Sequence, residues 1–179
     1  MALCSLSTGS SSTPLALAAA ITSSPAATRT SLFDNATCLP ARTVTFRVRD
    51  ENNEPTTAAF LIRDAQKRVY PSQAKRLAPD VPFHPQVYRG DGETLKLPDG
   101  DYTVEFSRGP ESISQTGPIK VDESTREFEF KVQRWIDPAK FGWWSGDHHI
   151  HAAGCAHYVK PTEGVLASDM IRHCTGEDL

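Results

Sequence analysis

Apolar and polar residues alternate along much of the chain between residues 42 and 133. In the first such run, Val44, Phe46 and Val48 are separated by threonine and arginine residues. Successive side chains of a strand point to opposite faces, so this period of two predicts a strand with one buried face. The pattern recurs further on, where Tyr102 begins one alternating run and Phe128 begins another.

Turn-forming residues separate the predicted strands. The acidic and asparagine-rich stretch 50–55 and the sequence Pro98-Asp99-Gly100 favour turns, and the proline-rich stretch 79–85 predicts an irregular surface loop. Roughly seven short strands with no helical period predict a small antiparallel β-sandwich over residues 42–134. The strands beyond the first are expected near residues 58–63, 68–70, 93–97, 101–106 and 126–133.

Two of these turns resemble those of a known domain family. Residues 48–55 (VRDENNEP) are similar to the first-turn signature of carboxypeptidase-regulatory-like, or transthyretin-like, domains, and residues 97–104 (LPDGDYTV) resemble the late hairpin of the same family. That signature usually carries glycine where this chain has Asn53. The resemblance implies a β-sandwich and is uninformative about chemistry, since such sandwiches are common accessory modules.

Residues 1–40 are rich in serine, threonine and alanine and are expected to form a disordered, signal-like leader outside the fold. The run 14–21 (PLALAAAI) resembles a short hydrophobic segment of a signal peptide, and the small residues 24–27 could follow it as a cleavage site. No lysine or arginine precedes Arg29, so the usual positive start is missing. Export to a secreted or periplasmic location is therefore one expectation, and a mis-started leader or a transit peptide are the others.

Length and charge narrow the class of protein. A chain of 179 residues suits one medium domain or two small ones, and it is too short for a complete large α/β barrel enzyme. The net charge of −3 gives no overall field that would attract a nucleic-acid backbone. No apolar run approaches the roughly 18–20 residues of a transmembrane helix.

The four cysteines show no CxxC pairing and are expected to be unpaired, although Cys155 and Cys174 could form a disulfide.

Five of the six histidines lie between residues 148 and 173. If the segment 147–151 is a strand, Asp147, His149 and His151 share one face. Two imidazoles at this spacing can converge on one metal ion or on adjacent ions, and they suit Zn, Mn or Fe. His157 follows in a glycine-containing loop and strengthens the case for a divalent metal site.

The segment Gly146-Asp147-His148-His149-Ile150-His151 resembles the opening motif of the polymerase-and-histidinol-phosphatase (PHP) superfamily, and most closely its carbaryl-hydrolase-like (CehA/McbA) branch. The resemblance implies that His149 and His151 bind metal and that His157 serves a neighbouring ion. Asp147 is then a carboxylate that does not bind the metal itself but orients a metal-binding imidazole. Alternatively, it caps a turn. The family usually has an apolar residue in place of His148.

A short helix is expected from Ala167 or Ser168, with Asp169 in its first turn and Gly176 at its end. A strand followed by a loop and a helix would form the first βα unit of a PHP-like α/β barrel, preceded by a linker over 135–145. The barrel domain is then expected to begin at residue 146 and to be truncated at 179, which makes the chain an inactive N-terminal fragment. Trp143 and Trp144 are expected to pack between sandwich and barrel.

Two hypotheses of different classes follow. The first is a hydrolase that cleaves phosphoesters, amides or carbamates of a small-molecule substrate with metal-activated water. The second is a non-catalytic β-sandwich that binds a partner or a carbohydrate and has an incidental histidine-rich tail. A zinc knuckle formed by Cys155, His157, His173 and Cys174 is a further arrangement that the sequence leaves open.

Overall fold

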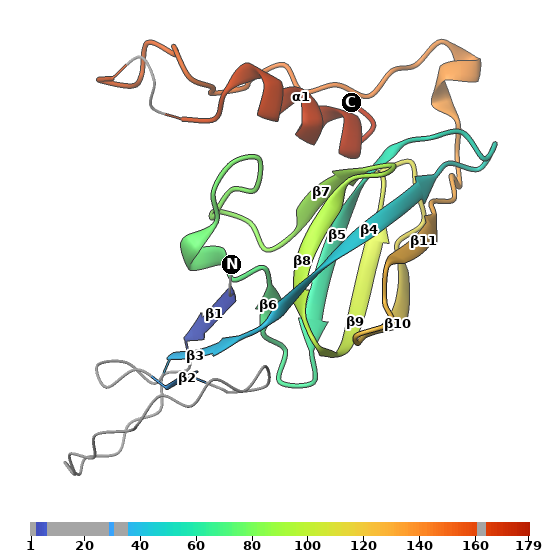
Figure 1. The fold of residues 1–179 in the computed structure, drawn as a ribbon. Coiled ribbons are helices and arrows are strands. Elements are labelled where there is room, and N and C mark those ends of the chain that lie inside the picture. Colours follow the sequence, from blue (N-terminus) through green and yellow to red (C-terminus); the bar gives the residue numbers. More distant parts are fainter. Residues whose placement is uncertain (1–2, 7–28, 31–35, 161–163) are drawn as a thin grey trace.

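The fold is described from a computed structural model that covers residues 3–6, 29–30, 36–160 and 164–179. The apolar run 14–21 and the small residues 24–27 of the predicted leader lie outside these described residues. The protein is mainly β, with two larger sheets and, in the described part of the chain, a single α-helix (Figure 1). This is a sandwich-like arrangement of two sheets around one core.

The first sheet is built around β4 (Ala41–Arg49). β4 pairs antiparallel with β8 (Thr94–Pro98) and parallel with β11 (Glu127–Lys131). The alternation read from the sequence is confirmed, because Val44, Phe46 and Val48 are fully buried. The parallel pair departs from the all-antiparallel prediction. A turn connects β10, the last strand of the other sheet, to β11. The chain therefore enters this sheet in the same direction as β4.

The second sheet follows the order β10-β9-β5-β6, and β7 also pairs with β5. Its pairs are all antiparallel. The strands are β5 (Thr57–Asp64), β6 (Val69–Tyr70), β7 (Val87–Gly90), β9 (Gly100–Ser107) and β10 (Gln115–Val121). The sequence did not predict β7 or β10. Pro118 lies within β10, and the sheet tolerates it because β10 is an edge strand.

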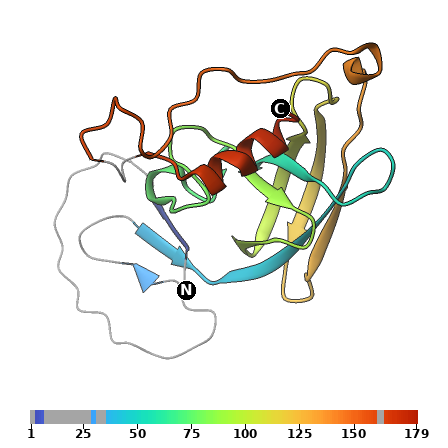
Figure 2. The same cartoon turned by 90° about the horizontal axis from the view of Figure 1, so that it is seen from above.

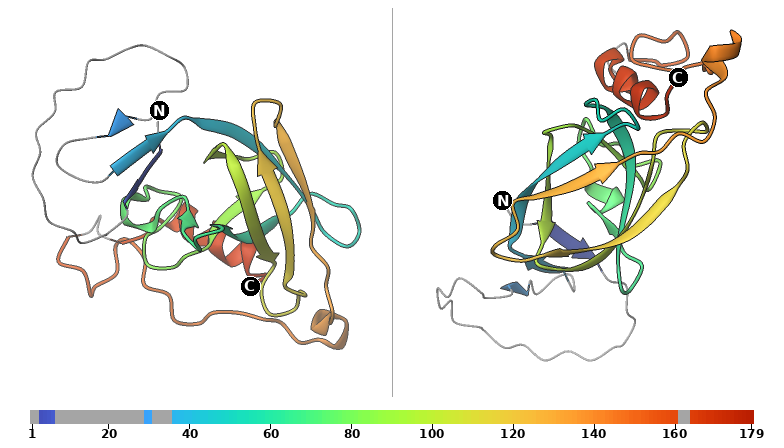
Figure 3. Two further views of the ribbon diagram at one scale, coloured as in Figure 1. Left: turned by 90° about the horizontal axis from the view of Figure 1, so that it is seen from below. Right: turned by 90° about the vertical axis from the view of Figure 1, so that its right-hand side faces the viewer.

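Four phenylalanines join the two sheets across the core. Phe60 of β5 lies with its ring centroid 5.0 Å from that of Phe46 in β4 and 4.8 Å from that of Phe130 in β11. Phe106 of β9 completes the cluster at 5.1 Å from Phe130. Figure 3 shows the two sheets facing each other around this core. The other buried core residues are Val44, Val48, Ala58, Ile62, Tyr70, Val87, Leu95, Leu97, Tyr102, Val104, Val121 and Val132.

Three short strands near the start of the chain form a separate small sheet in the order β1-β3-β2. They are β1 (Leu3–Leu6), β2 (Arg29–Thr30) and β3 (Ala36–Leu39). Two 3-10 helices lie elsewhere in the described residues. η1 (Gln73–Lys75) precedes the irregular proline-rich loop, and η2 (Pro138–Phe141) lies in the segment that follows the sandwich.

The α-helix α1 (Ala167–Gly176) lies across one end of the second sheet, against β5 and β7 (Figures 1 and 2). The predicted helix is confirmed, including Asp169 in its first turn. Gly176 is its last residue and is buried. A Cβ atom at this position would overlap the ring of Tyr88, so glycine allows the helix to approach the sheet closely.

The segment after the sandwich is fixed at its start by charged groups. Arg134 forms ion pairs with Glu51, Glu111 and Asp178, and the hydroxyl of Ser145 donates to Glu111 at 2.7 Å. Asp178 follows α1, so Arg134 connects both ends of the segment 135–178. Trp143 and Trp144 lie within this segment and are 74% and 81% exposed, so they do not show the packing expected for them.

Replacing Phe60 by alanine should test the role of the aromatic core. The Phe60→Ala change leaves a cavity between the sheets, and we expect a loss of about 3–5 kcal/mol in the free energy of unfolding. Leu61→Ala is the matched control, because Leu61 is only half-buried on the neighbouring position of the same strand. Urea unfolding followed by far-UV circular dichroism measures both. Equal losses in the two variants would contradict this assignment of the core.

Candidate metal site

The segment 147–151 is irregular, so the expectation of a strand here is wrong. A strand requires a neighbour that satisfies its backbone groups, and none of the described strands pairs with these residues. Figures 1 and 2 show this part of the chain running back over the same end of the sandwich that carries α1. The strand half of the predicted βα unit is therefore not formed by these residues, whereas its helix is.

His149 and His151 nevertheless turn their rings toward each other. Their Nε2 atoms are 2.9 Å apart, and their ring centroids are 4.8 Å apart. The carboxylate of Asp147 accepts a hydrogen bond from the backbone N–H of His149 at 2.9 Å. Asp147 thus caps a turn of its own backbone, which is the alternative role that the sequence left open.

Two consecutive turns fold the chain after His151 back on itself. The N–H of Cys155 donates to the carbonyl of Ala152 at 3.0 Å, and the N–H of Tyr158 donates to the carbonyl of Cys155 at 3.0 Å. Gly154 has a φ of 88°, in the left-handed region that glycine adopts without strain. The loop is closed at its base, where the N–H of Ala153 donates to the carbonyl of Val165 at 2.8 Å.

These turns bring a thiol and two imidazoles together. Cys155 Sγ lies 3.3 Å from His151 Nδ1 and 3.1 Å from His157 Nδ1. The ligand atoms of the three residues lie within 4.8 Å of one another, which is close enough for one metal ion. Both histidines are exposed and Cys155 is half-buried, so the cluster is open to solvent.

Of the predicted site residues, His151 and His157 lie within this cluster and His149 touches it through His151. Cys155 belongs to the cluster, but from sequence it was considered as an unpaired thiol, as a disulfide partner of Cys174 or as part of a zinc knuckle. The sequence did contain a signal for this residue, because Cys155 stands four residues after His151 and two before His157. The exposed His148 is not part of the group of possible metal ligands found among the described residues.

The structure does not assemble the alternative knuckle. His173 and Cys174 lie on α1, and neither belongs to the group of possible metal ligands among the described residues. The ring of His173 stacks on Tyr88 with centroids 4.6 Å apart and faces His84 at 5.3 Å. Glu177 accepts a hydrogen bond from the hydroxyl of Tyr88 at 2.5 Å. These residues hold α1 against the sheet.

The contact between His173 and the sheet has an electrostatic consequence. Burial lowers the pKa of His173, and the neighbouring His84 lowers it further, whereas a hydrogen bond to the Pro79 carbonyl and the carboxylates of Asp169 and Asp80 oppose the shift. The Nε2 atom of His173 is buried and has no hydrogen-bond partner among the residues that the structure describes. The folded protein therefore favours the neutral imidazole at this position.

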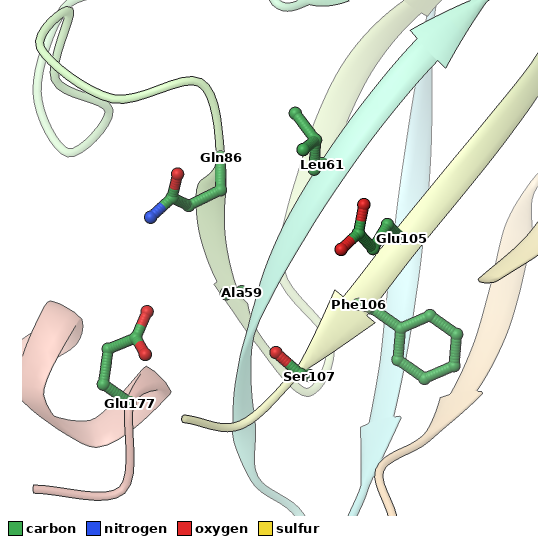
Figure 4. A pocket seen from close by; sticks show the side chains of 7 residues that line it. All are labelled: Ala59, Leu61, Gln86, Glu105, Phe106, Ser107 and Glu177. Atoms are coloured by element: carbon green, nitrogen blue, oxygen red, sulfur yellow. The ribbon is translucent and has the colours of Figure 1, made fainter. Parts of the chain in front are cut away.

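A shallow cleft of about 170 Å³ lies beside α1, apart from the histidine–cysteine cluster (Figure 4). Glu177 faces it from the end of the helix, and Gln86 and Glu105 face it from the sheet side. It includes none of the histidines or cysteines discussed above. The cluster of His151, Cys155 and His157 lies instead on an exposed loop.

Comparisons with family models, with curated proteins and with solved structures found no match to this chain. Among the described residues, no helix combines the length and apolar character needed to cross a membrane.

The pKa of His173 predicts a pH dependence of stability. Because this pKa is lowered from its ordinary value of 6.5, the unfolded state binds more protons near that pH, and stability should fall as the pH drops below 6.5. His173→Phe keeps an aromatic ring on Tyr88 but cannot be protonated. We expect its free energy of unfolding to fall less than that of the wild type between neutral and mildly acidic pH.

Urea unfolding at a series of pH values measures this difference. His148→Phe is the control, because it makes the same substitution at an exposed histidine outside α1. Parallel curves for wild type and His173→Phe would show that His173 does not titrate with folding.

Proposed function

We propose that residues 146–179 belong to a PHP-like, metal-dependent hydrolase domain, and that the sandwich before them is an accessory domain of the carboxypeptidase-regulatory type. The observation that carries this proposal is the convergence of three imidazoles, those of His149, His151 and His157, on one short loop. The motif resemblance is the second support. Export of the protein, the expectation drawn from its leader, is part of the same proposal.

The donor set fits a divalent transition metal. Imidazole nitrogens and a thiol suit zinc and iron better than magnesium or calcium, which prefer oxygen ligands. A bound ion of this kind lowers the pKa of a coordinated water toward neutrality and polarises a phosphoryl or carbonyl group. The residues of the chain would hold the ion, leave one position open to solvent, and orient the rings through their mutual contacts.

The substrate class that suits such a site is a small phosphoester, amide or carbamate. Each carries an oxygen that a metal can polarise and a bond that hydroxide can cleave. No serine or cysteine nucleophile is required by this chemistry. The exposed position of the loop allows a small molecule to reach the cluster.

One observation favours a second candidate, a non-catalytic binding module. Trp135, Trp143 and Trp144 are 62%, 74% and 81% exposed, which is unusual for large aromatic side chains. Exposed indoles close to one another in sequence are suited to stack on a carbohydrate ring or a protein partner. In that case the histidine-rich loop would have no catalytic role.

Zinc binding distinguishes the two candidates. We expect the wild-type chain to bind zinc in competition with a chromophoric chelator, and the double variant His151→Ala/His157→Ala to lose at least tenfold in affinity. His148→Ala is the matched control, since it removes an exposed histidine from the same loop without touching the cluster. Equally weak binding by wild type and double variant would reject the metal site and leave the binding module.

A further inference from the structure

His151 uses both of its ring nitrogens in the cluster. Its Nδ1 lies 3.3 Å from Cys155 Sγ, and its Nε2 lies 2.9 Å from His149 Nε2. The two nitrogens of one imidazole point in divergent directions and cannot both bind the same ion. The ion is therefore held either by the two histidines of the His-x-His pair or by the group that contains Cys155, and the turns around Gly154 favour the second.

We infer that Cys155 is a metal ligand. Its Sγ forms a one-sulfur, two-nitrogen site with His151 Nδ1 and His157 Nδ1. His149 is not a ligand but contacts the other nitrogen of His151 and so orients its ring. This inference rests on the proposed metal-binding function and specifies its ligands. It differs from the arrangement implied by the motif resemblance, in which His149 and His151 share the role of ligands and no thiol takes part.

The distances support this ligand set. With metal–sulfur and metal–nitrogen bonds of about 2.3 and 2.0–2.1 Å, a tetrahedral ion holds its sulfur and nitrogen ligands about 3.6 Å apart. The two sulfur–nitrogen distances in the cluster are 3.3 and 3.1 Å. Each of these two sulfur–nitrogen pairs therefore needs to open by only a few tenths of an ångström to admit an ion.

His149 has a defined task in this arrangement. When Nδ1 of His151 binds the ion, its ring proton is on Nε2, and this N–H can donate to Nε2 of His149 at the observed 2.9 Å. Metal-bound imidazoles commonly donate their second N–H to a carboxylate, a backbone carbonyl or water, which fixes the ring and the tautomer, and His149 Nε2 takes that place here. The turn capped by Asp147 holds the backbone of His149 in place for this contact.

The thiolate also determines which ions the site prefers. Sulfur ligands favour zinc, cobalt and iron over magnesium and manganese, whereas a site made of imidazoles and carboxylates accepts manganese readily. Three protein ligands leave the fourth tetrahedral position for water, as in catalytic zinc sites. A hydrolase that uses this site should therefore be a zinc or iron enzyme and should be poorly supported by manganese.

Cobalt titration of the whole chain tests the ligand directly, because a thiolate bound to Co²⁺ gives a charge-transfer absorption in the near ultraviolet. We expect this band in the wild type. Cys155→Ser should lose the band but keep the visible absorption of histidine-bound cobalt. Cys174→Ser is the matched control and should keep the band, since Cys174 lies on α1 outside the cluster.

The outcomes separate this inference from the proposed function. Cobalt bound through histidines without the near-ultraviolet band would overturn the role of Cys155 and leave the metal-binding function standing. A wild type that takes up neither cobalt nor zinc would reject both.

The role of His149 has its own test in zinc affinity. We expect His149→Ala to weaken zinc binding about 10–100-fold, as for other residues that orient a ligand. His157→Ala should weaken it more, and far-UV circular dichroism should show both variants folded. An effect of His149→Ala as large as that of His151→Ala, with Cys155→Ser unaffected, would support the His-x-His arrangement and overturn ours.

Discussion

The constraint on which the rest of the structure depends is that two small sheets must share one apolar core. Phe60 meets this requirement by contacting Phe46 and Phe130 of the opposite sheet, so a single side chain connects both layers. With the sheets joined in this way, β5 and β7 present a fixed end against which α1 packs. Without that support, a helix of only 10 residues would be marginal in water.

The loop that carries the cluster of His151, Cys155 and His157 belongs, with α1, to one segment that is anchored to the sandwich. Arg134, where the segment begins, pairs with Glu111 of the sandwich and with Asp178 at the end of the segment, and Arg172 of the helix pairs with Glu93 of the sandwich. The chain between these anchors must return on itself, and Gly154 allows the sharp turn that this requires. We infer that the cluster owes its convergence to local turns within an anchored segment, rather than to a strand of a sheet.

Sequence reasoning predicted the strands with clear alternation, such as β4, and the helix with its acidic first turn. It missed β7, which is short, and β10, whose Gly117 and Pro118 argue against a strand unless its edge position is known. For the site, the histidine motif predicted His149, His151 and His157 as ligands, and the structure brings their rings together while their metal binding stays a prediction. Cys155 could not be placed, because an extended chain would separate it from His151 by about 13 Å. Only the turns at Ala152–Tyr158 bring the two within contact.

The central claim is that the thiolate of Cys155 and the imidazoles of His151 and His157 coordinate a single metal ion. X-ray absorption spectroscopy at the zinc edge of the zinc-loaded full chain measures this most directly. The account predicts a sulfur neighbour at about 2.3 Å together with nitrogen or oxygen neighbours at about 2.0–2.1 Å. A spectrum that fits nitrogen and oxygen neighbours alone would contradict it.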